Sequence, residues 1–329
     1  MKTEPLQVKR SGDFYYPIYF EEGFGSLADA IRTEGLDSRK MCIVSDTNVA
    51  PLYADSLKSA LSSVASSISL FVFEAGEKSK HLHTVQNLYE KLIESELDRK
   101  SLIVALGGGV VGDLAGFSAA TYLRGIDFIQ VPTTLLAQVD SSVGGKTGVD
   151  FNQLPTTLLA QVDSSVGGKT GVDFDQYKNM VGAFHQPRLV YMNLQTLKSL
   201  PDTQFACGMG EVLKTGLICD GDFYHFVCEH QKAIQNLDPE LLAQMIRRCC
   251  EIKAGVVERD PKEQGERALL NLGHTIGHAV EKLMDFQLLH GQCVAIGLVA
   301  AAFISMKRGL LTENEYQQIR TGWELYRLP

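Results

Sequence analysis

The sequence predicts a two-domain protein, with an α/β domain built on a mostly parallel sheet followed by an all-helical domain. The first part of this prediction rests on short apolar runs that alternate with helical patterns up to about residue 131. The second part rests on long stretches of helical spacing, with few β-branched runs, after about residue 194. We place the boundary near Pro187, which gives domains of 1–187 and 188–329, and we expect the active site in the cleft between them.

The individual elements follow from local patterns. Four short apolar runs that end in turn residues predict buried strands over 40–46, 67–73, 101–106 and 125–131. Helices are expected from Pro51, because proline is well tolerated in a first turn, over 81–97, and from about Leu114. In the second half, helical spacing covers 202–232, 238–259, 268–284 and 290–308.

The middle of the chain contains an identical repeat. Residues 132–151 read PTTLLAQVDSSVGGKTGVDF, and residues 155–174 read the same twenty residues again. A solenoid would show three or more diverged copies with atypical ends. Two copies without divergence indicate a recent tandem duplication or an error of sequence assembly.

Composition is that of an ordinary soluble protein, with 329 residues, 45% apolar and 21% charged. No continuous apolar run reaches the roughly 18 residues that span a bilayer, and the N-terminus has no signal-peptide pattern. The seven cysteines lack CxxC spacing, which favours reduced thiols in the cytoplasm. A net charge of −8 argues against nonspecific binding of nucleic acid.

A glycine-rich turn, GGGVVGD at 107–113, follows the third expected strand. Glycines there let backbone amides approach a pyrophosphate, and the start of the next helix favours its negative charge. The spacing is not GxGxxG, and such a turn also serves tight packing. Polar residues at 45–48 and 76–80 follow the first two strands, and the carboxyl ends of parallel strands line one crevice. These features together predict a Rossmann-like nucleotide site, although each polar segment alone is also explained as a helix cap.

A second group of residues is typical of a metal site. The segment NLGHTIGH places His274 and His278 one helical turn apart on one face. His290 follows in LLHGQ, and Glu211 lies in GMGEVLK. One Glu with two His is an open three-ligand set for a catalytic divalent ion, usually zinc, and leaves one histidine for acid–base work. The alternative is a pair of ordinary histidines on a helix.

A third group is basic and lies in or beside these polar motifs. In an acidic protein such a set suits a substrate that carries phosphate and carboxylate groups, although any one of them alone is better explained as a solvated surface residue. The group comprises Arg124, Lys146 or Lys169, Lys178 with Asn179, Lys214, Lys253 and Arg267.

The motifs GGGVVGDLAGFSAATYLRG, FIQVPTTLLAQVDSSVGGKTGV, KNMVGAFHQP, GEVLKTG, RALLNLGHTIGHAVE and LHG resemble those of the 3-dehydroquinate synthase family, from about residue 40 to about 310. The resemblance implies a cyclase of the shikimate pathway that depends on NAD and on zinc or cobalt, and that acts on 3-deoxy-D-arabino-heptulosonate 7-phosphate. In the family reaction C5 is oxidised, phosphate is eliminated, the ketone is reduced again, and an aldol step closes the carbocycle. We also expect a cytoplasmic homodimer without nucleic-acid or membrane partners.

The resemblance also implies roles for individual residues. Glu211, His274 and His290 would bind the metal, and His278 would transfer a proton or contact phosphate. The substrate would be held by Arg124, Lys178, Asn179, Lys214, Lys253, Arg267 and Asn271, with Asp140 and Lys146 or Lys169 as further catalytic residues. NAD would be contacted by Asp46, Asn48, Glu77, Lys80, Gly108, Gly109, Val110, Val111, Gly112, Asp113, Thr133, Thr134, Lys146, Lys178, Thr196, Leu197, Lys198 and Ser199.

The chain departs from the family pattern at two places. The family has one PTT…GGK segment, and deletion of 150–172 would restore its spacing. The strand at 125–131 leads directly into the first copy, so we expect that copy, with Asp140 and Lys146, to be the working one. Against this, Lys169 of the second copy keeps the short family spacing to Lys178. The second departure is the end at LYRLP, before the family's last helical segment with its further lysine motif.

Two other functions stay open on the sequence alone. Another sugar phosphate cyclase would share the NAD and metal residues and differ in its substrate contacts. A remnant that binds NAD and metal without catalysis would also fit a chain with this insert and this end. A polyol dehydrogenase is less favoured, because net redox chemistry does not need so many phosphate-holding cations.

Overall fold

A computed structural model describes residues 4–10, 13–144, 146–149, 181–260, 265–284 and 287–329. The chain divides into two compact units. Unit 1 comprises Met1–Thr133 and Ser141–Thr196, and unit 2 comprises Thr134–Asp140 and Leu197–Pro329. The second repeat copy, at 155–174, lies outside the described residues.

Unit 1 contains a seven-stranded sheet in the order β1-β2-β9-β6-β5-β3-β4. All neighbouring strands are parallel except β1 and β2, which are antiparallel. The strands are β1 (Leu6–Arg10), β2 (Asp13–Glu21), β3 (Arg39–Asp46), β4 (Ala65–Phe73), β5 (Leu102–Gly107), β6 (Asp127–Pro132) and β9 (Val190–Asn193). The four strands expected from apolar runs are therefore confirmed as β3 to β6.

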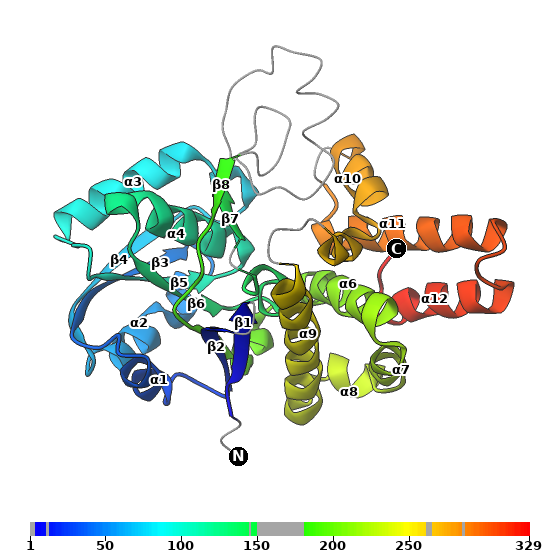
Figure 1. Ribbon diagram of the computed structural model, residues 1–329, viewed down its shortest axis with the longest axis horizontal. Coiled ribbons are helices and arrows are strands. Elements are labelled where there is room, and N and C mark those ends of the chain that lie inside the picture. The colour runs from blue at the N-terminus through cyan, green and yellow to red at the C-terminus, as the bar shows by residue number, and fades with distance from the viewer. Residues whose placement is uncertain (1–3, 11–12, 145, 150–180, 261–264, 285–286) are drawn as a thin grey trace, which may run out of the picture. The chain divides into compact units, whose positions relative to one another are not determined.

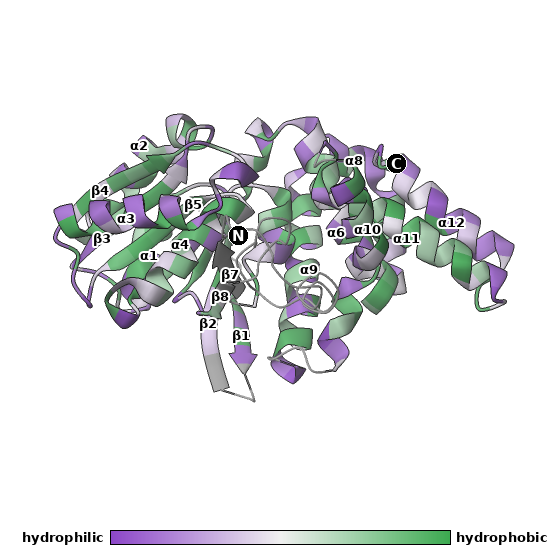
Figure 2. Cartoon of the chain, turned by 90° about the horizontal axis from the view of Figure 1, so that it is seen from above, coloured by the Kyte–Doolittle hydropathy of each residue, from purple (hydrophilic) through white to green (hydrophobic). Residues whose placement is uncertain are grey.

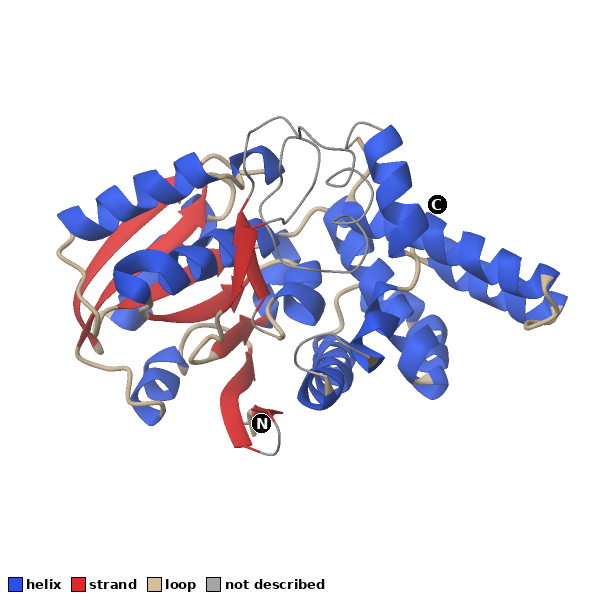
Figure 3. Cartoon of the chain, turned by 45° about the horizontal axis from the view of Figure 1, so that its top comes forward, coloured by secondary structure: helices blue, strands red, loops and turns tan. Residues whose placement is uncertain are grey.

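Helices cover both faces of this sheet (Figures 1 and 3). One face packs against α1 (Leu27–Thr33) and α2 (Ala50–Leu61), and the other against α3 (Leu82–Glu94) and α4 (Gly109–Thr121). Successive residues of β5 point to opposite faces, so Ile103 contributes to the α3–α4 side and Val104 to the α1–α2 side. Strands buried on both faces explain why β3 and β5 read as continuous apolar runs.

The start of α4 lies nearer to the sheet than the sequence pattern suggests. The helix begins at Gly109 with Gly108 as its N-cap, five residues before the expected start at Leu114. Two of the four residues in its first turn are glycines, which carry no side chain to show helical periodicity, so the pattern locates only the later part. Its N-terminus therefore lies directly after β5, where a phosphate-binding turn would have to be.

A short two-stranded sheet follows the first repeat copy. It pairs β7 (Lys146–Val149) with β8 (Val181–Phe184) in antiparallel register. Beyond the boundary expected near Pro187, β9 still joins the sheet of unit 1, and the units divide after Thr196. The short segment Thr134–Asp140 groups with unit 2, although it follows β6 directly.

Unit 2 is helical in its described part (Figure 3). It consists of the π-helical segment η3 (Ala137–Ser141), of which all but Ser141 belongs to this unit, the 3-10 segment η5 (Glu266–Asn271), and α6 (Asp202–Cys219), α7 (Gly221–Glu229), α8 (Gln231–Gln235), α9 (Pro239–Arg259), α10 (His274–Leu283), α11 (His290–Lys307) and α12 (Glu313–Leu325). The helical spacing of the second half is confirmed.

Close backbone contacts join the helices that carry the expected metal ligands. A Cβ atom on Gly297 of α11 would lie 1.9 Å from the carbonyl oxygen of Gly273, directly before α10. A Cβ atom on Gly291 would lie 2.0 Å from the carbonyl oxygen of Cys207 in α6. Only glycine fits at both places, so α11 is held against the other two helices at backbone distance.

Helix α11 is long and apolar enough, by length and composition, to cross a membrane, with a mean hydropathy of 1.3 over His290–Lys307. It is coloured mainly as hydrophobic in Figure 2, whereas α12 carries many hydrophilic residues. Its apolar composition has a local explanation, because Cys293, Val294, Ala295 and Leu298 are buried in unit 2. The buried residues lie mainly in the first half of the helix, whereas Phe303 and Ile304 near its end are exposed.

Candidate active site

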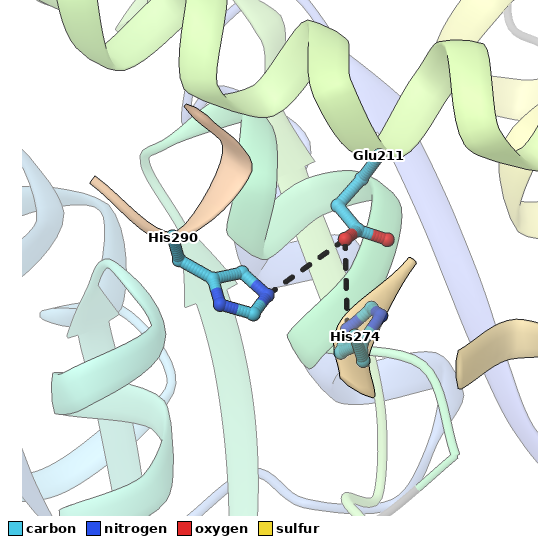
Figure 4. A group of neighbouring side chains, drawn as sticks. All are labelled: Glu211, His274 and His290. Carbon is cyan, nitrogen blue, oxygen red and sulfur yellow. Dashed lines mark ion pairs between the residues drawn. The ribbon is translucent and has the colours of Figure 1, made fainter. Parts of the chain in front are cut away.

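Three side chains from three helices converge in unit 2 (Figure 4). The Nε2 atoms of His290 and His274 lie 3.8 Å and 4.0 Å from Oε1 of Glu211. A tetrahedral site with ligand bonds of about 2.1 Å separates its ligand atoms by about 3.4 Å, so these spacings are close to those around one ion. Oε1 of Glu211 is buried and has no hydrogen-bond partner among the described residues, as expected of an atom that awaits a cation.

Local structure explains how the three residues meet. His274 and His290 are the first residues of α10 and α11, and Gly273 enters α10 with φ of +81°, which favours glycine. Glu211 lies in the middle of α6 and is 2% exposed. Its other oxygen, Oε2, pairs with the Lys214 ammonium one turn along the same helix. One oxygen of the buried carboxylate is thus paired with Lys214, and the other faces the two histidines.

The electrostatics of the group keep His274 neutral. Burial, the Lys214 charge and the two neighbouring histidines together lower the pKa of His274 to about 2. The neutral imidazole is the form that binds a metal ion, whereas the protonated ring cannot. The residues present therefore fit a divalent ion with protein ligands at three positions and an open fourth position.

An ion pair between Asp140 and Lys253 adjoins this group. The Lys253 ammonium contacts the Asp140 carboxylate and also donates to its carbonyl oxygen at 2.5 Å. Burial raises the pKa of the Asp140 carboxyl, but the charges of Lys253 and Lys214, together with the hydrogen bond from Lys253, outweigh this and hold it well below its usual range. The first repeat copy therefore supplies a charged carboxylate to a cluster that also contains two of the expected substrate-binding lysines.

The remaining expected substrate residues of unit 2 occupy different positions. Arg267 is buried in η5, which packs against α6 and α9, and its backbone N–H donates to Oδ2 of Asp260 at 3.1 Å. Asn271 ends η5. The ring of His278 lies 5.2 Å from that of His274 and 5.9 Å from that of His290, measured between centroids. His278 therefore joins the metal group without being one of its three ligands.

In unit 1 the glycine-rich turn is held by β6. The backbone N–H of Thr133 donates to the carbonyl oxygen of Gly107 at 3.0 Å. The Thr133 side chain is buried, and its Oγ1 has no hydrogen-bond partner among the described residues. A buried hydroxyl beside a helix N-terminus is consistent with a ligand at this turn, and Gly108 caps the helix without offering a side chain.

Lys80 connects two of the expected cofactor segments. Its ammonium lies 2.8 Å from Oδ2 of Asp113, at the end of the glycine turn, and 3.7 Å from Oε1 of Glu77. Lys80 is only 5% exposed, so its charge is compensated inside unit 1 by these two carboxylates. Val111 of α4, by contrast, is fully buried in the core and serves packing.

Other expected cofactor residues are engaged in local structure. Oδ1 of Asp46 accepts the backbone N–H groups of Asn48 and Val49, both at 2.9 Å, which stabilises the turn between β3 and α2. Thr134 accepts the Ala137 N–H at 3.1 Å through Oγ1. The 3-10 segment η4 (Leu194–Ser199) begins after β9 and contains the other expected cofactor residues, Thr196, Leu197, Lys198 and Ser199.

Five further expected site residues are not tested by these contacts. Arg124 is exposed at the end of a short 3-10 turn, η2 (Tyr122–Arg124), and has φ of +68°. Lys169, Lys178 and Asn179 lie outside the described residues. Lys146 is described by its backbone alone, which pairs with Phe184 in β8.

Sequence reasoning overlooked one residue of this region. Glu281 of α10 is 5% exposed, and its carboxylate forms a second close group with His278 and His290. The signal was present, because Glu281 follows His278 by three positions and His274 by seven, which places all three on one helical face.

Comparison with solved structures identifies the class of this fold. A 2-deoxy-scyllo-inosose synthase complexed with carbaglucose-6-phosphate, NAD⁺ and Co²⁺ is similar with a TM-score of 0.82 and 28% identity, over 98% of this chain and 80% of that one. A 2-epi-5-epi-valiolone synthase from Streptomyces hygroscopicus subsp. jinggangensis with NAD⁺ and Zn²⁺ bound has a TM-score of 0.82 and 25% identity, over 98% and 84%. The chain thus has the fold of the sugar phosphate cyclases.

Sequence comparison narrows this class. A model of the 3-dehydroquinate synthase C-terminal domain matches residues 208–329, and one of the N-terminal domain matches 70–154 and 148–207, two segments that overlap inside the repeated region. The 3-dehydroquinate synthases of Symbiobacterium thermophilum and Acetivibrio thermocellus are 47% and 42% identical, over 93% and 96% of this chain and 79% and 81% of their own lengths. The chain belongs to the 3-dehydroquinate synthase family, whose members are enzymes.

Proposed function

We propose that this chain is a 3-dehydroquinate synthase that converts 3-deoxy-D-arabino-heptulosonate 7-phosphate to 3-dehydroquinate and phosphate. It is then a lyase, because a carbon–oxygen bond to phosphate breaks without hydrolysis. We further propose that it acts in the cytoplasm as a homodimer, without nucleic-acid or membrane partners. An acidic chain with a net charge of −8 and relatives that are biosynthetic enzymes support these assignments.

The observation that carries the proposal is the convergence of Glu211, His274 and His290 around a buried oxygen that lacks a hydrogen-bond partner. The related cyclases contain NAD⁺ with Co²⁺ or Zn²⁺, and we assign the same cofactors here. The three residues would hold the metal ion. The turn at 107–113, with Thr133 beside it, would hold the pyrophosphate of NAD.

The chain's own residues have distinct tasks in this proposal. When bound, the metal ion would polarise a substrate hydroxyl while NAD accepts and later returns a hydride. Lys253, held by Asp140, and Lys214, held by Glu211, supply fixed positive charge for an anionic substrate. The exposed ring of His278 moves a proton at one of its nitrogens during loss of phosphate.

Other sugar phosphate cyclases are the main alternative, and relatedness favours the proposed reaction. The solved cyclases of other specificity are 25–28% identical, whereas the 3-dehydroquinate synthases named above are 42–47% identical. The test is a substrate panel with the zinc-loaded protein and NAD. We expect 3-dehydroquinate from the heptulosonate phosphate and no carbocycle from glucose 6-phosphate, and the reverse result would assign the chain to another cyclase.

A further inference from the structure

Glu281 is a buried carboxylate beside the metal group that the proposed reaction leaves without a task. It lies on α10 and is 5% exposed. Its carboxylate oxygen and one ring nitrogen each of His278 and His290 lie within 4.8 Å of one another. A carboxylate at this depth is costly to bury unless nearby donors compensate it, and an imidazole N–H is a group that can act as such a donor.

The two histidine ligands differ in how their rings are held. Nδ1 of His274 lies 3.3 Å from the carbonyl oxygen of Leu272, so a backbone acceptor fixes its second nitrogen. His290 presents Nε2 to Glu211, and its other ring nitrogen points away from that carboxylate (Figure 4). In the described part of the chain, the His290 ring has an ion-pair contact with Glu211 and ring contacts with His274 and His278. Glu281 is the carboxylate that is grouped with this ring.

Metal-bound histidines usually donate their second N–H to a carboxylate or a carbonyl, which fixes the tautomer and the direction of the ring. At His274 the acceptor of the second N–H is the Leu272 carbonyl oxygen. At His290 we expect a side chain to be this acceptor. We propose that Glu281 is a positioning residue that accepts the second N–H of His290 and thereby fixes the metal group. The inference rests on the proposed metal role of Glu211, His274 and His290.

A second ion held by His278, Glu281 and His290 is the competing explanation. One imidazole has two nitrogens, and His290 already directs Nε2 toward Glu211. Because a second ion would have to share this ring with the first, a positioning role agrees better with the geometry. The number of ions bound per chain separates the two explanations.

The test compares Glu281→Gln, which keeps the size of the side chain, with Glu281→Ala. Glu251→Gln is the matched control, because Glu251 is an α9 carboxylate paired with Arg247 and lies outside both close groups. Zinc affinity is measured by chelator competition, cobalt coordination by visible absorption, and folding by thermal melting of the metal-free proteins. None of these readouts depends on activity.

We expect Glu281→Gln to weaken zinc binding about tenfold and Glu281→Ala to weaken it more, and both should alter the cobalt spectrum. The control Glu251→Gln should bind zinc and cobalt as the unsubstituted protein does. Affinity within twofold of the parent and an unchanged spectrum in folded Glu281→Gln would overturn the proposal, even if melting shifts. If the unsubstituted protein binds two ions per chain and Glu281→Gln binds one, Glu281 is a ligand of a second metal ion and not a positioning residue. His274→Ala tests the proposed metal site on which this inference rests. Unchanged metal binding in that variant would show that the metal site is wrongly assigned.

Discussion

Glu211 and Lys214 form a buried ion pair across one turn of α6, through the Oε2 atom of the carboxylate. Both side chains are almost fully buried, at 3% and 4% exposure. The pair leaves Oε1 directed at the two histidines, so one carboxylate serves both a permanent cation and a metal site. This double use determines what a substitution at Glu211 will do.

Glu211→Gln should abolish stoichiometric metal binding and also destabilise the metal-free protein. The amide is a poor metal ligand, and it leaves the Lys214 ammonium buried without its counter-charge, which costs about 3–5 kcal/mol. Urea unfolding and metal analysis check the two effects separately. Glu211→Gln combined with Lys214→Met should regain most of the stability but none of the metal. If the double variant retains one zinc per chain, the ligand assignment is wrong.

Two glycines of the turn should respond differently to substitution. A Cβ on Gly107 would lie 2.4 Å from Cγ2 of Val111, so Gly107→Ala should cost about 1–3 kcal/mol of stability. Among the described residues, a Cβ on Gly109 meets only Ser141, at 3.4 Å, so Gly109→Ala should fold normally. Gly109→Val adds bulk where the backbone is expected to approach a pyrophosphate and should abolish NAD binding in calorimetry. Unchanged NAD affinity in folded Gly109→Val would contradict the site.

The stability contribution of Asp140 should depend on pH with a defined sign. The pKa of Asp140 is lowered in the folded protein, so its ionised form stabilises the fold above its unfolded pKa of about 3.9. That contribution is lost as the pH falls below this value toward the folded pKa. The difference in unfolding free energy between metal-free parent and Asp140→Asn should be constant from pH 7 to about 5 and shrink toward pH 3. A difference that grows on acidification would contradict the ion pair with Lys253.

Removal of one repeat copy should improve the protein. The second copy adds an apolar LLAQV segment, whose side chains must pack against other residues or be exposed to solvent. The added loop length itself costs little entropy. Deletion of 150–172 should raise the melting temperature and any cyclase activity. In the full chain Lys146→Ala should reduce activity more than Lys169→Ala. Loss of activity with Lys169→Ala alone would make the second copy the working one.

The predictable part of unit 1 is the part that is buried on both sides. Continuous apolar runs predicted β3 and β5, because side chains on both faces enter cores. The strand β9 escaped notice because it has only four residues, VYMN, soon after Pro187. The antiparallel pair β1 and β2 forms one end of the sheet, with β1 at the edge, and the two strands alternate too irregularly to be predicted from the pattern.

The predictable part of the site is the part with local spacing. His274 and His278 stand one turn apart, and His290 and Glu211 lie in further polar motifs. The family resemblance then indicated which two of the three histidines bind the metal. The pairs Lys80–Asp113 and Asp140–Lys253 join residues far apart in the chain, so their contact follows from the fold and not from any local pattern. Glu281 was overlooked because a charged residue on an amphipathic helix usually faces water, and its burial depends on packing between α10 and α11.

The proposed zinc- and NAD-dependent reaction is tested most directly by following all of its products in a single assay. Metal-free protein is supplied with NAD and 3-deoxy-D-arabino-heptulosonate 7-phosphate, and zinc is titrated in while phosphate, 3-dehydroquinate and NADH are followed together. We expect no turnover without metal, then equal amounts of phosphate and 3-dehydroquinate with no net NADH. This turnover should saturate at one zinc per chain and be absent in His274→Ala. Phosphate release that is independent of zinc, or accumulation of NADH in proportion to product, would contradict the proposed reaction.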